Sequence, residues 1–92
     1  MIKKVVISKA AERDLQIVPD YIALKFMSWV EFVEHKGVEA ARKIRGFHDE
    51  ALQGRRWGQR SLRLSRTYRA IYRVVKGEIE FLLVEEVNKH DY

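Results

Sequence analysis

The stretch that decides the fold is GRRWGQRSLRLSRTYRAIYR, residues 54–73. Within it, Leu62 and Leu64 alternate with polar residues, so residues 60–65 predict a half-buried strand with one polar face. Residues 68–75 predict a second strand, because the chain continues to alternate. One of its faces carries Arg69, Ile71 and Arg73, and the other carries Tyr68, Ala70, Tyr72 and Val74.

The same stretch holds a concentrated positive charge. It contains no Asp or Glu but seven arginines: Arg55, Arg56, Arg60, Arg63, Arg66, Arg69 and Arg73. The chain has 18 Lys and Arg against 13 Asp and Glu, so without these seven the remainder has 11 basic residues and is slightly acidic. The net charge of +5 is therefore a local patch.

Arginine binds phosphate through a flat, bidentate fork, and a concentrated basic patch attracts a polyanion. Trp57, Tyr68 and Tyr72 lie among the arginines, where aromatic rings can stack on unpaired bases. The patch predicts a nucleic-acid ligand. An acidic protein partner of a solvated basic face is the alternative.

Towards the C-terminus, Lys76 and Gly77 predict a tight hairpin turn in which Gly supplies a positive φ. Residues 79–87 then predict a third strand. Its segment 81–84, FLLV, is apolar on both faces, which indicates a central position in the sheet.

Towards the N-terminus, residues 3–8 predict a strand, and Ser8 is a candidate N-cap for a helix that opens at Lys9 or Ala10. Pro19 should break or kink that helix. Beyond it, the apolar stripe Ile22, Phe26, Trp29 and Val33 has helical spacing and is more typical of a core than of a binding face.

Gly37 is expected to be a left-handed C-cap, followed by a helix from about Val38 to near Arg45. Residues 47–58 are expected to be mostly loop. The order strand, two helices, three antiparallel strands predicts one α+β domain over residues 1–92, with the helices packed on one face of a small twisted sheet.

Composition excludes several classes of protein. No apolar run approaches the ~20 residues that span a bilayer, and the N-terminal segment is too short for a signal peptide. Cys is absent, and the three His show no metal-ligand spacing. We therefore expect a cytoplasmic domain that uses no metal and no cofactor and does not contact a membrane.

If the ligand is RNA, the simplest reaction without a cofactor is attack of a ribose 2′-OH on the adjacent phosphate. It needs a base, an acid and fixed positive charge around the phosphate. Arginine can supply only the charge. His48 and His90 are the candidate proton carriers. From the residues alone, a loop hydrogen bond for His48 and a solvated chain end for His90 are the simpler interpretations.

Four segments together resemble the RelE-type toxins of bacterial type II toxin–antitoxin systems, near the RelE/StbE-like and HigB-like branches. They are ERDL…VPDYI, GFHDEALQGRRWGQRS, SLRLSRTYRAIYRV and the ending EVNKHDY. The resemblance implies a RelE-like fold and a metal-independent endonuclease that cleaves translated mRNA in the ribosomal A site. It also implies a cognate antitoxin, usually encoded by the adjacent gene, and binding to operator DNA only through the antitoxin complex.

The resemblance also implies roles for residues. Arg69 in YRAIY matches the arginine that stabilises the phosphate, and Arg63 matches one of the two catalytic lysines of RelE. Ser61 matches the other lysine, so the lysine base of RelE is absent here. His90 falls where RelE has a catalytic arginine, and His48 resembles the loop histidine of HigB toxins.

The His-Asp-Tyr ending is similar to the tails of HigB and YoeB toxins. His90 would then act as acid or base, Asp91 would orient it, and Tyr92 would stack on the substrate or hydrogen-bond to it. The expected RNA-binding residues are Arg55, Arg56, Arg60, Arg66, Arg73 and Lys89.

A non-catalytic basic module, a degenerate toxin that docks an acidic antitoxin or nucleic acid, is the alternative function. A DNA-specific regulator is disfavoured, because no recognition-helix pattern carries the charge.

Overall fold

A five-stranded sheet, in the order β1-β5-β4-β3-β2, forms one layer of the molecule. This computed structural model describes residues 1–89. The strands are β1 (Val5–Ile7), β2 (Glu50–Ala51), β3 (Gln59–Arg63), β4 (Tyr68–Val75) and β5 (Phe81–Lys89). All neighbours are antiparallel except β1 and β5, which are parallel. Strand β5 is therefore central, between β1 and β4, as its apolar sequence predicts.

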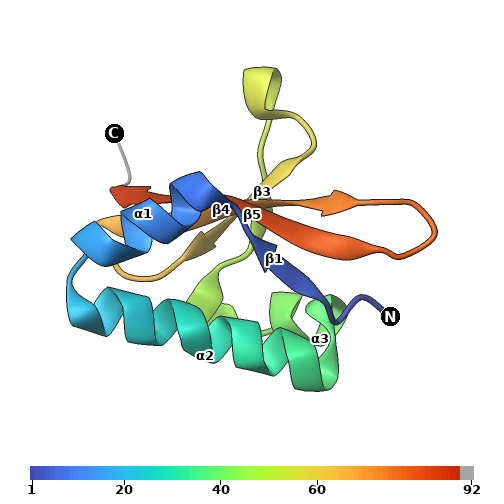
Figure 1. Ribbon diagram of the computed structural model, residues 1–92, viewed down its shortest axis with the longest axis horizontal. Coiled ribbons are helices and arrows are strands. Elements are labelled where there is room, and N and C mark those ends of the chain that lie inside the picture. The colour runs from blue at the N-terminus through green and yellow to red at the C-terminus, as the bar shows by residue number, and fades with distance from the viewer. Residues whose placement is uncertain (90–92) are drawn as a thin grey trace.

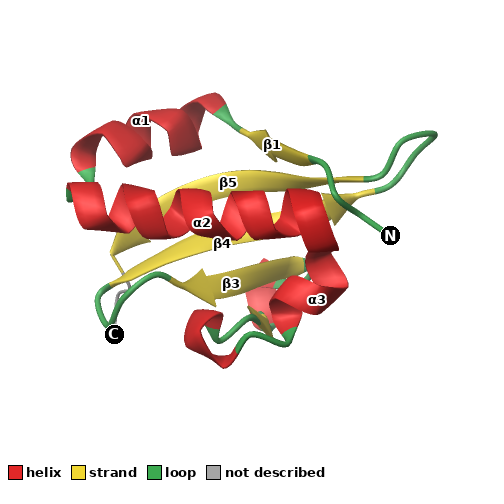
Figure 2. Cartoon of the chain, turned by 90° about the horizontal axis from the view of Figure 1, so that it is seen from below, coloured by secondary structure: helices red, strands yellow, loops and turns green. Residues whose placement is uncertain are grey.

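Helices α2 (Asp20–Lys36) and α3 (Val38–Arg42) form the second layer, and α1 (Lys9–Ile17) lies along β5 beyond the end of β1, as Figures 1 and 2 show. The predicted helix start is confirmed, because the side chain of Ser8 accepts a hydrogen bond of 3.1 Å from the backbone N–H of Ala11. The predicted break is confirmed as well, since Pro19 separates α1 from α2. None of the helices within residues 1–89 is long and apolar enough to cross a membrane.

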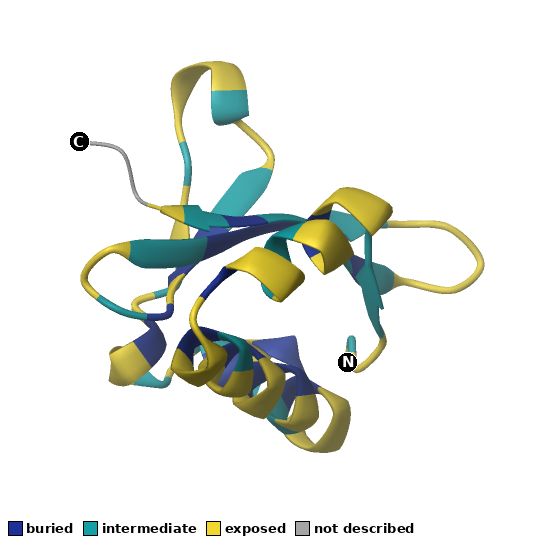
Figure 3. Cartoon of the chain, turned by 60° about the vertical axis from the view of Figure 1, so that its left-hand side comes forward, coloured by how far each residue is buried: buried dark blue, intermediate teal, exposed yellow. Residues whose placement is uncertain are grey.

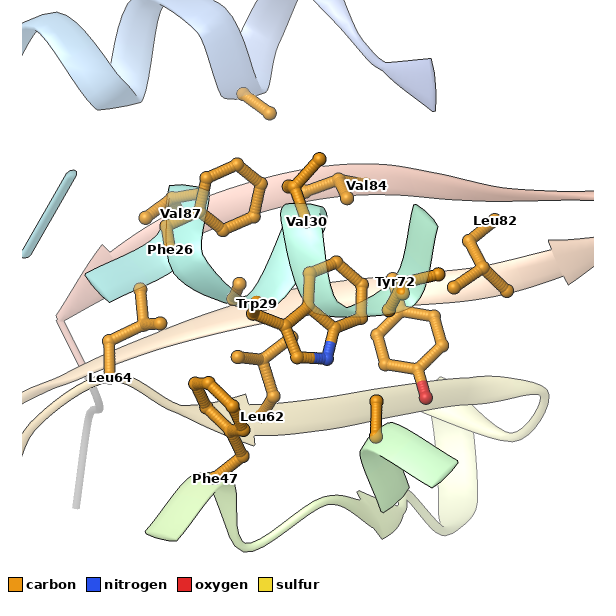
Figure 4. Close-up of a cluster of buried hydrophobic side chains, with 14 of the residues drawn as sticks. Phe26, Trp29, Val30, Phe47, Leu62, Leu64, Tyr72, Leu82, Val84 and Val87 are labelled. Carbon is orange, nitrogen blue, oxygen red and sulfur yellow. The ribbon is translucent and has the colours of Figure 1, made fainter. Parts of the chain in front are cut away.

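The core lies between α2 and the sheet (Figure 4). Each residue of the predicted stripe on α2 is completely buried: Ile22, Phe26, Trp29 and Val33. The ring of Trp29 lies 5.2 Å from that of Tyr72 on β4. Such aromatic pairs contribute about 0.5–1.5 kcal/mol beyond their buried area. The stripe therefore belongs to the core, as its spacing predicts.

A β-bulge interrupts the pairing of β4 with β5. Ile71 pairs with Glu86, whereas the next residue, Tyr72, pairs with Val84. Glu85 is thus the extra residue of the bulge, and bulges increase the local twist of a sheet.

Some predicted boundaries are wrong. Helix α3 ends at Arg42 and not near Arg45, because the chain turns through the 3₁₀ helix η1 (Arg45–Phe47) to bury Phe47. Gly37 has the expected positive φ of 89°, but its ψ of 159° is extended and not left-handed helical.

The prediction of a tight turn at Lys76 and Gly77 is wrong. Residues 76–80 connect β4 to β5, and Gly77 is not among the glycines of positive φ.

The segment expected to be mostly loop contains two short elements, β2 and the 3₁₀ helix η2 (Gly54–Arg56). Figure 1 shows the part around η2, in yellow, rising from the sheet on the side away from α2. Most of it is exposed (Figure 3).

Candidate active site

The face of the sheet that the helices leave open carries the basic residues of β3 and β4. Leu62, Ala70 and Val87 point into the core, so their neighbours in the strands point to the opposite face. Across this open face, Arg63 is opposite Arg69 in the β3–β4 register, and Arg69 is opposite Asn88 in the β4–β5 register. The two arginines therefore stand opposite each other on adjacent strands.

These arginines form one wall of a pocket of about 70 Å³, which we call the arginine pocket. It is lined by His48, Glu50, Ser61, Arg63, Ser65, Arg66, Tyr68 and Arg69. The structure thus brings together four of the residues that the sequence predicts for the site: His48, Arg63, Arg66 and Arg69.

Arg69 is half-buried, and its Nε–H is fully buried without a hydrogen-bond partner among residues 1–89. A buried donor left unsatisfied costs about 1–3 kcal/mol. Arg69 also lines the arginine pocket, so an anion bound there lies against its guanidinium. Phosphate oxygens suit a guanidinium, because they accept its parallel N–H groups.

His48 enters the pocket from the turn that follows η1. Its φ of 43° and ψ of 53° place it in the left-handed region, where residues other than Gly are uncommon and which costs energy. The imidazole Nε2 lies 3.5 Å from a carboxylate oxygen of Glu50, and both side chains are exposed. A histidine held in this way beside two arginines can exchange a proton with a bound substrate.

The next residue, Asp49, points into the protein, and its side chain is completely buried. It accepts a hydrogen bond of 2.6 Å from Arg60 Nε and one of 2.5 Å from the hydroxyl of Tyr72. Arg42 Nε donates in turn to that hydroxyl at 3.4 Å. We call Asp49, Arg60 and Tyr72 the Asp49 clamp.

The clamp fixes the segment that carries His48. Burial, followed by the charge of Asp49, raises the pKa of Tyr72 to about 12. Arg60 therefore has a structural partner inside the protein. The expectation that Tyr72 stacks on a base is wrong, because its ring is completely buried beside Trp29 and only the hydroxyl reaches the edge of the core (Figure 4).

The arginine-rich stretch has no acidic residues of its own, but β5 supplies them. Arg56 lies 3.0 Å from Glu86, and Arg73 lies 3.4 Å from Glu85. Burial acts to raise the pKa of Glu86, but hydrogen bonds from Arg56 and Asn88 outweigh it, so its pKa lies below the ordinary value. Positive charge on the open face is thus neutralised around Arg56.

The remaining predicted residues lie elsewhere. Arg55 and Arg73 border a second hollow beside Trp57, and Lys89 is exposed at the end of β5, opposite Tyr68. His90, Asp91 and Tyr92 lie outside the described residues. No group of three or more His, Asp or Glu in residues 1–89 is placed to hold a metal ion.

Sequence reasoning missed the clamp. The sequence shows only that an acidic residue, Asp49, follows a candidate histidine, His48. It does not show that the Asp49 side chain is buried.

Neither a protein-family model nor a curated protein matches the sequence. Solved structures match it over nearly its whole length. A chain of the archaeal RelE–RelB complex from Pyrococcus horikoshii OT3 superimposes with a TM-score of 0.70 at 24% identity, covering 97% of this chain and 96% of that one. The chain has the RelE-type toxin fold.

Two further structures support the same RelE-type fold. A chain of the YoeB–YefM complex from Staphylococcus aureus gives a TM-score of 0.70 at 19% identity, covering 96% of this chain and 97% of that one. The YoeB/ParE toxin from Agrobacterium tumefaciens gives 0.67 at 21% identity, covering 96% and 99%. The α+β, RelE-like fold predicted from the sequence is confirmed.

Proposed function

We propose that this protein is the toxin of a type II toxin–antitoxin pair and acts as a ribosome-dependent mRNA endonuclease. One observation carries the proposal: the arginine pocket joins two adjacent arginines, one with an unsatisfied buried N–H, to a histidine. That combination suits a phosphodiester, which needs both charge stabilisation and proton transfer to be cleaved.

In the proposed reaction, Arg69 and Arg63 bind the non-bridging oxygens of the scissile phosphate. The ribose 2′-oxygen attacks phosphorus and loses its proton to a base, while the bond from phosphorus to the 5′-oxygen breaks and that oxygen receives a proton. The products are a 2′,3′-cyclic phosphate and a 5′-hydroxyl.

His48 serves one of the two proton transfers. His90, oriented by Asp91, is proposed for the other, and Tyr92 for a contact to the substrate. Arg66 and Lys89 would hold the RNA nearby.

The partners follow from the fold relatives. Two of them were solved as complexes, RelE with RelB and YoeB with YefM. We propose a cognate antitoxin for this chain, encoded by the adjacent gene, that covers the basic face and recruits operator DNA for the complex. The toxin would act in the cytoplasm.

The test is to map 5′ ends of a reporter mRNA in a cell-free translation reaction with wild-type protein and Arg69→Ala. We expect new ends inside the translated frame with the wild type, none when initiation is blocked, and none with Arg69→Ala. Arg13→Ala is the charge-matched control, because Arg13 is an exposed residue of α1 outside the pocket. It should cleave like the wild type.

Absence of new ends with folded wild-type protein, while the protein still binds RNA, would contradict an endonuclease. Cuts that persist when initiation is blocked would contradict ribosome dependence.

A further inference from the structure

A second hollow borders the open face and shares no lining residue with the arginine pocket. Its volume is about 550 Å³, and its walls are formed by Arg55, Trp57, Gly58, Gln59, Arg73, Val74 and Glu85. Sites for small ligands have volumes of about 300–1,000 Å³. The hollow is therefore large enough for a nucleotide, whereas the arginine pocket fits little more than a phosphate.

Trp57 is 80% exposed. Such exposure is unusual, because tryptophan side chains are highly buried on average and their burial stabilises proteins. The backbone holds Trp57 in this position. Gly54 and Gly58, on either side of the turn, have φ angles of 66° and 95°, and the N–H of Trp57 donates to the carbonyl of Gly54 at 3.1 Å. Trp57 also lines a neighbouring hollow beside Leu52. The fold thus presents the indole to solvent.

The charges around Trp57 suit a phosphate. Arg55 is exposed and forms no ion pair or hydrogen bond with any residue from 1 to 89. Arg73 is paired with Glu85 at 3.4 Å, and about half of its side chain remains exposed. The side-chain amide of Gln59 also donates a hydrogen bond of 3.1 Å to the Glu85 oxygen that faces Arg73.

The hollow also lies in line with the arginine pocket. Arg69 and Arg73 are on the same face of β4, four residues apart, which corresponds to about 13 Å along a strand. A single strand of RNA held at Arg69 can therefore reach Trp57 within a short distance along the sheet.

We propose that this hollow binds an unpaired nucleotide of the RNA, with its base stacked on Trp57 and its phosphate bound by Arg55. The assignment rests on the proposed function and adds a second contact away from the scissile phosphate. A base suits the indole because stacking on an aromatic ring works for every base and requires no particular sequence. An acidic peptide suits the hollow less well, because carboxylate side chains can pair with Arg55 but have no flat ring to stack on the exposed indole.

The experiment is a fluorescence titration of the Arg69→Ala protein with a short single-stranded RNA of mixed sequence, which this background leaves uncut. The chain has two tryptophans, and Trp29 is completely buried, so quenching by the RNA reports Trp57. We expect quenching by RNA and its loss when Trp57→Phe is added. Trp57→Ala should weaken binding, measured by anisotropy of labelled RNA, about 5- to 150-fold.

Arg55→Ala should weaken binding and lower the salt dependence by about one phosphate contact. Arg13→Ala, with the same loss of charge on α1, should leave the affinity unchanged. Urea unfolding of each variant checks that the exposed substitutions leave the fold intact.

The outcomes separate this inference from the proposed function. Unchanged RNA affinity in folded Trp57→Ala overturns the nucleotide site, even where Arg69→Ala abolishes cleavage. If Trp57→Ala loses antitoxin binding but binds RNA like its parent, the nucleotide site is overturned too, and the hollow is a protein contact. Binding of RNA that depends on Trp57, in a protein whose wild type never cleaves, supports the site and overturns the endonuclease.

Discussion

His48 and Asp49 are neighbours in the chain, but they belong to two sites of opposite character. Asp49 is buried in the Asp49 clamp, where its carboxylate accepts two short hydrogen bonds. His48 borders the arginine pocket, where the Nε–H of Arg69 has no partner within residues 1–89. In the clamp the guanidinium of Arg60 donates to a buried carboxylate, whereas in the pocket the Nε–H of Arg69 donates to no group within residues 1–89.

The difference shows that arginines of one basic stretch have two roles, one in holding the structure and one in the candidate site. A buried, satisfied pair holds structure, and removing one partner leaves an uncompensated charge. An unsatisfied buried donor costs about 1–3 kcal/mol of stability, so its presence beside a pocket indicates a functional site. The clamp should therefore govern unfolding, and the pocket should govern cleavage.

The largest expected effect is that of Asp49→Ala. It leaves Arg60 and the hydroxyl of Tyr72 without their shared acceptor, so we expect the free energy of unfolding to fall by about 3–5 kcal/mol. That is a large part of the ~5–15 kcal/mol of a small domain. Urea denaturation measures it. Glu50→Ala removes an exposed carboxylate next to it and should cost less than about 0.5 kcal/mol.

An Asp49→Ala protein as stable as Glu50→Ala would show that the clamp does not hold this segment.

For His48→Gly we expect the opposite result, in which cleavage is lost and stability is kept. Glycine adopts the left-handed conformation without strain, so the free energy of unfolding should stay the same or rise by up to about 1 kcal/mol. Loss of the imidazole should lower the rate of cleavage about 100-fold or more. The rate at which new 5′ ends appear during translation measures this. His35→Ala, at an exposed position of α2, is the control and should cleave normally.

Cleavage by His48→Gly at the wild-type rate would exclude His48 from proton transfer and leave that role to His90.

Tyr72→Phe removes only the hydroxyl from the clamp and keeps the ring beside Trp29. Hydrogen bonds to a charged group contribute about 1.5–3 kcal/mol, so we expect a loss of free energy of unfolding near the lower end of that range. Cleavage by the folded variant should change little.

The stability difference between the wild type and Tyr72→Phe should also depend on pH. The pKa of Tyr72 is about 12 in the folded protein and ordinarily 10.0, so the unfolded chain ionises first as the pH rises. The contribution of Tyr72 is fully present below pH 10 and is lost as the pH rises through about 12. The stability difference between the wild type and Tyr72→Phe should therefore shrink over that window, as urea titrations at several pH values can measure. A constant difference would contradict the raised pKa.

What the sequence could predict is what depends on local spacing. The stripe on α2 and the bounds of β4, residues 68–75, follow from periods of 3.6 and 2, and both are confirmed. The central place of β5 follows from its apolar faces. Strand β2 is too short, at two residues, to leave any period.

The site was less predictable because its partners come from distant segments. Asp49 meets Tyr72 across 23 residues, and Arg56 meets Glu86 across 30. Strand pairing creates these contacts, and the sequence near each arginine does not show them. It therefore did not distinguish Arg60, which is paired, from Arg69, which has the free donor. The assignments of His90, Asp91 and Tyr92 stay predictions.

The most direct test of the central claim is to measure two quantities on Arg69→Ala: the free energy of unfolding and the rate of mRNA cleavage during translation. We predict that the free energy of unfolding falls by no more than about 1 kcal/mol, because the substitution removes a buried N–H that has no hydrogen-bond partner within residues 1–89. Cleavage should fall by a factor of about 10² to 10³. A stable Arg69→Ala protein that cuts mRNA at the wild-type rate would contradict the account.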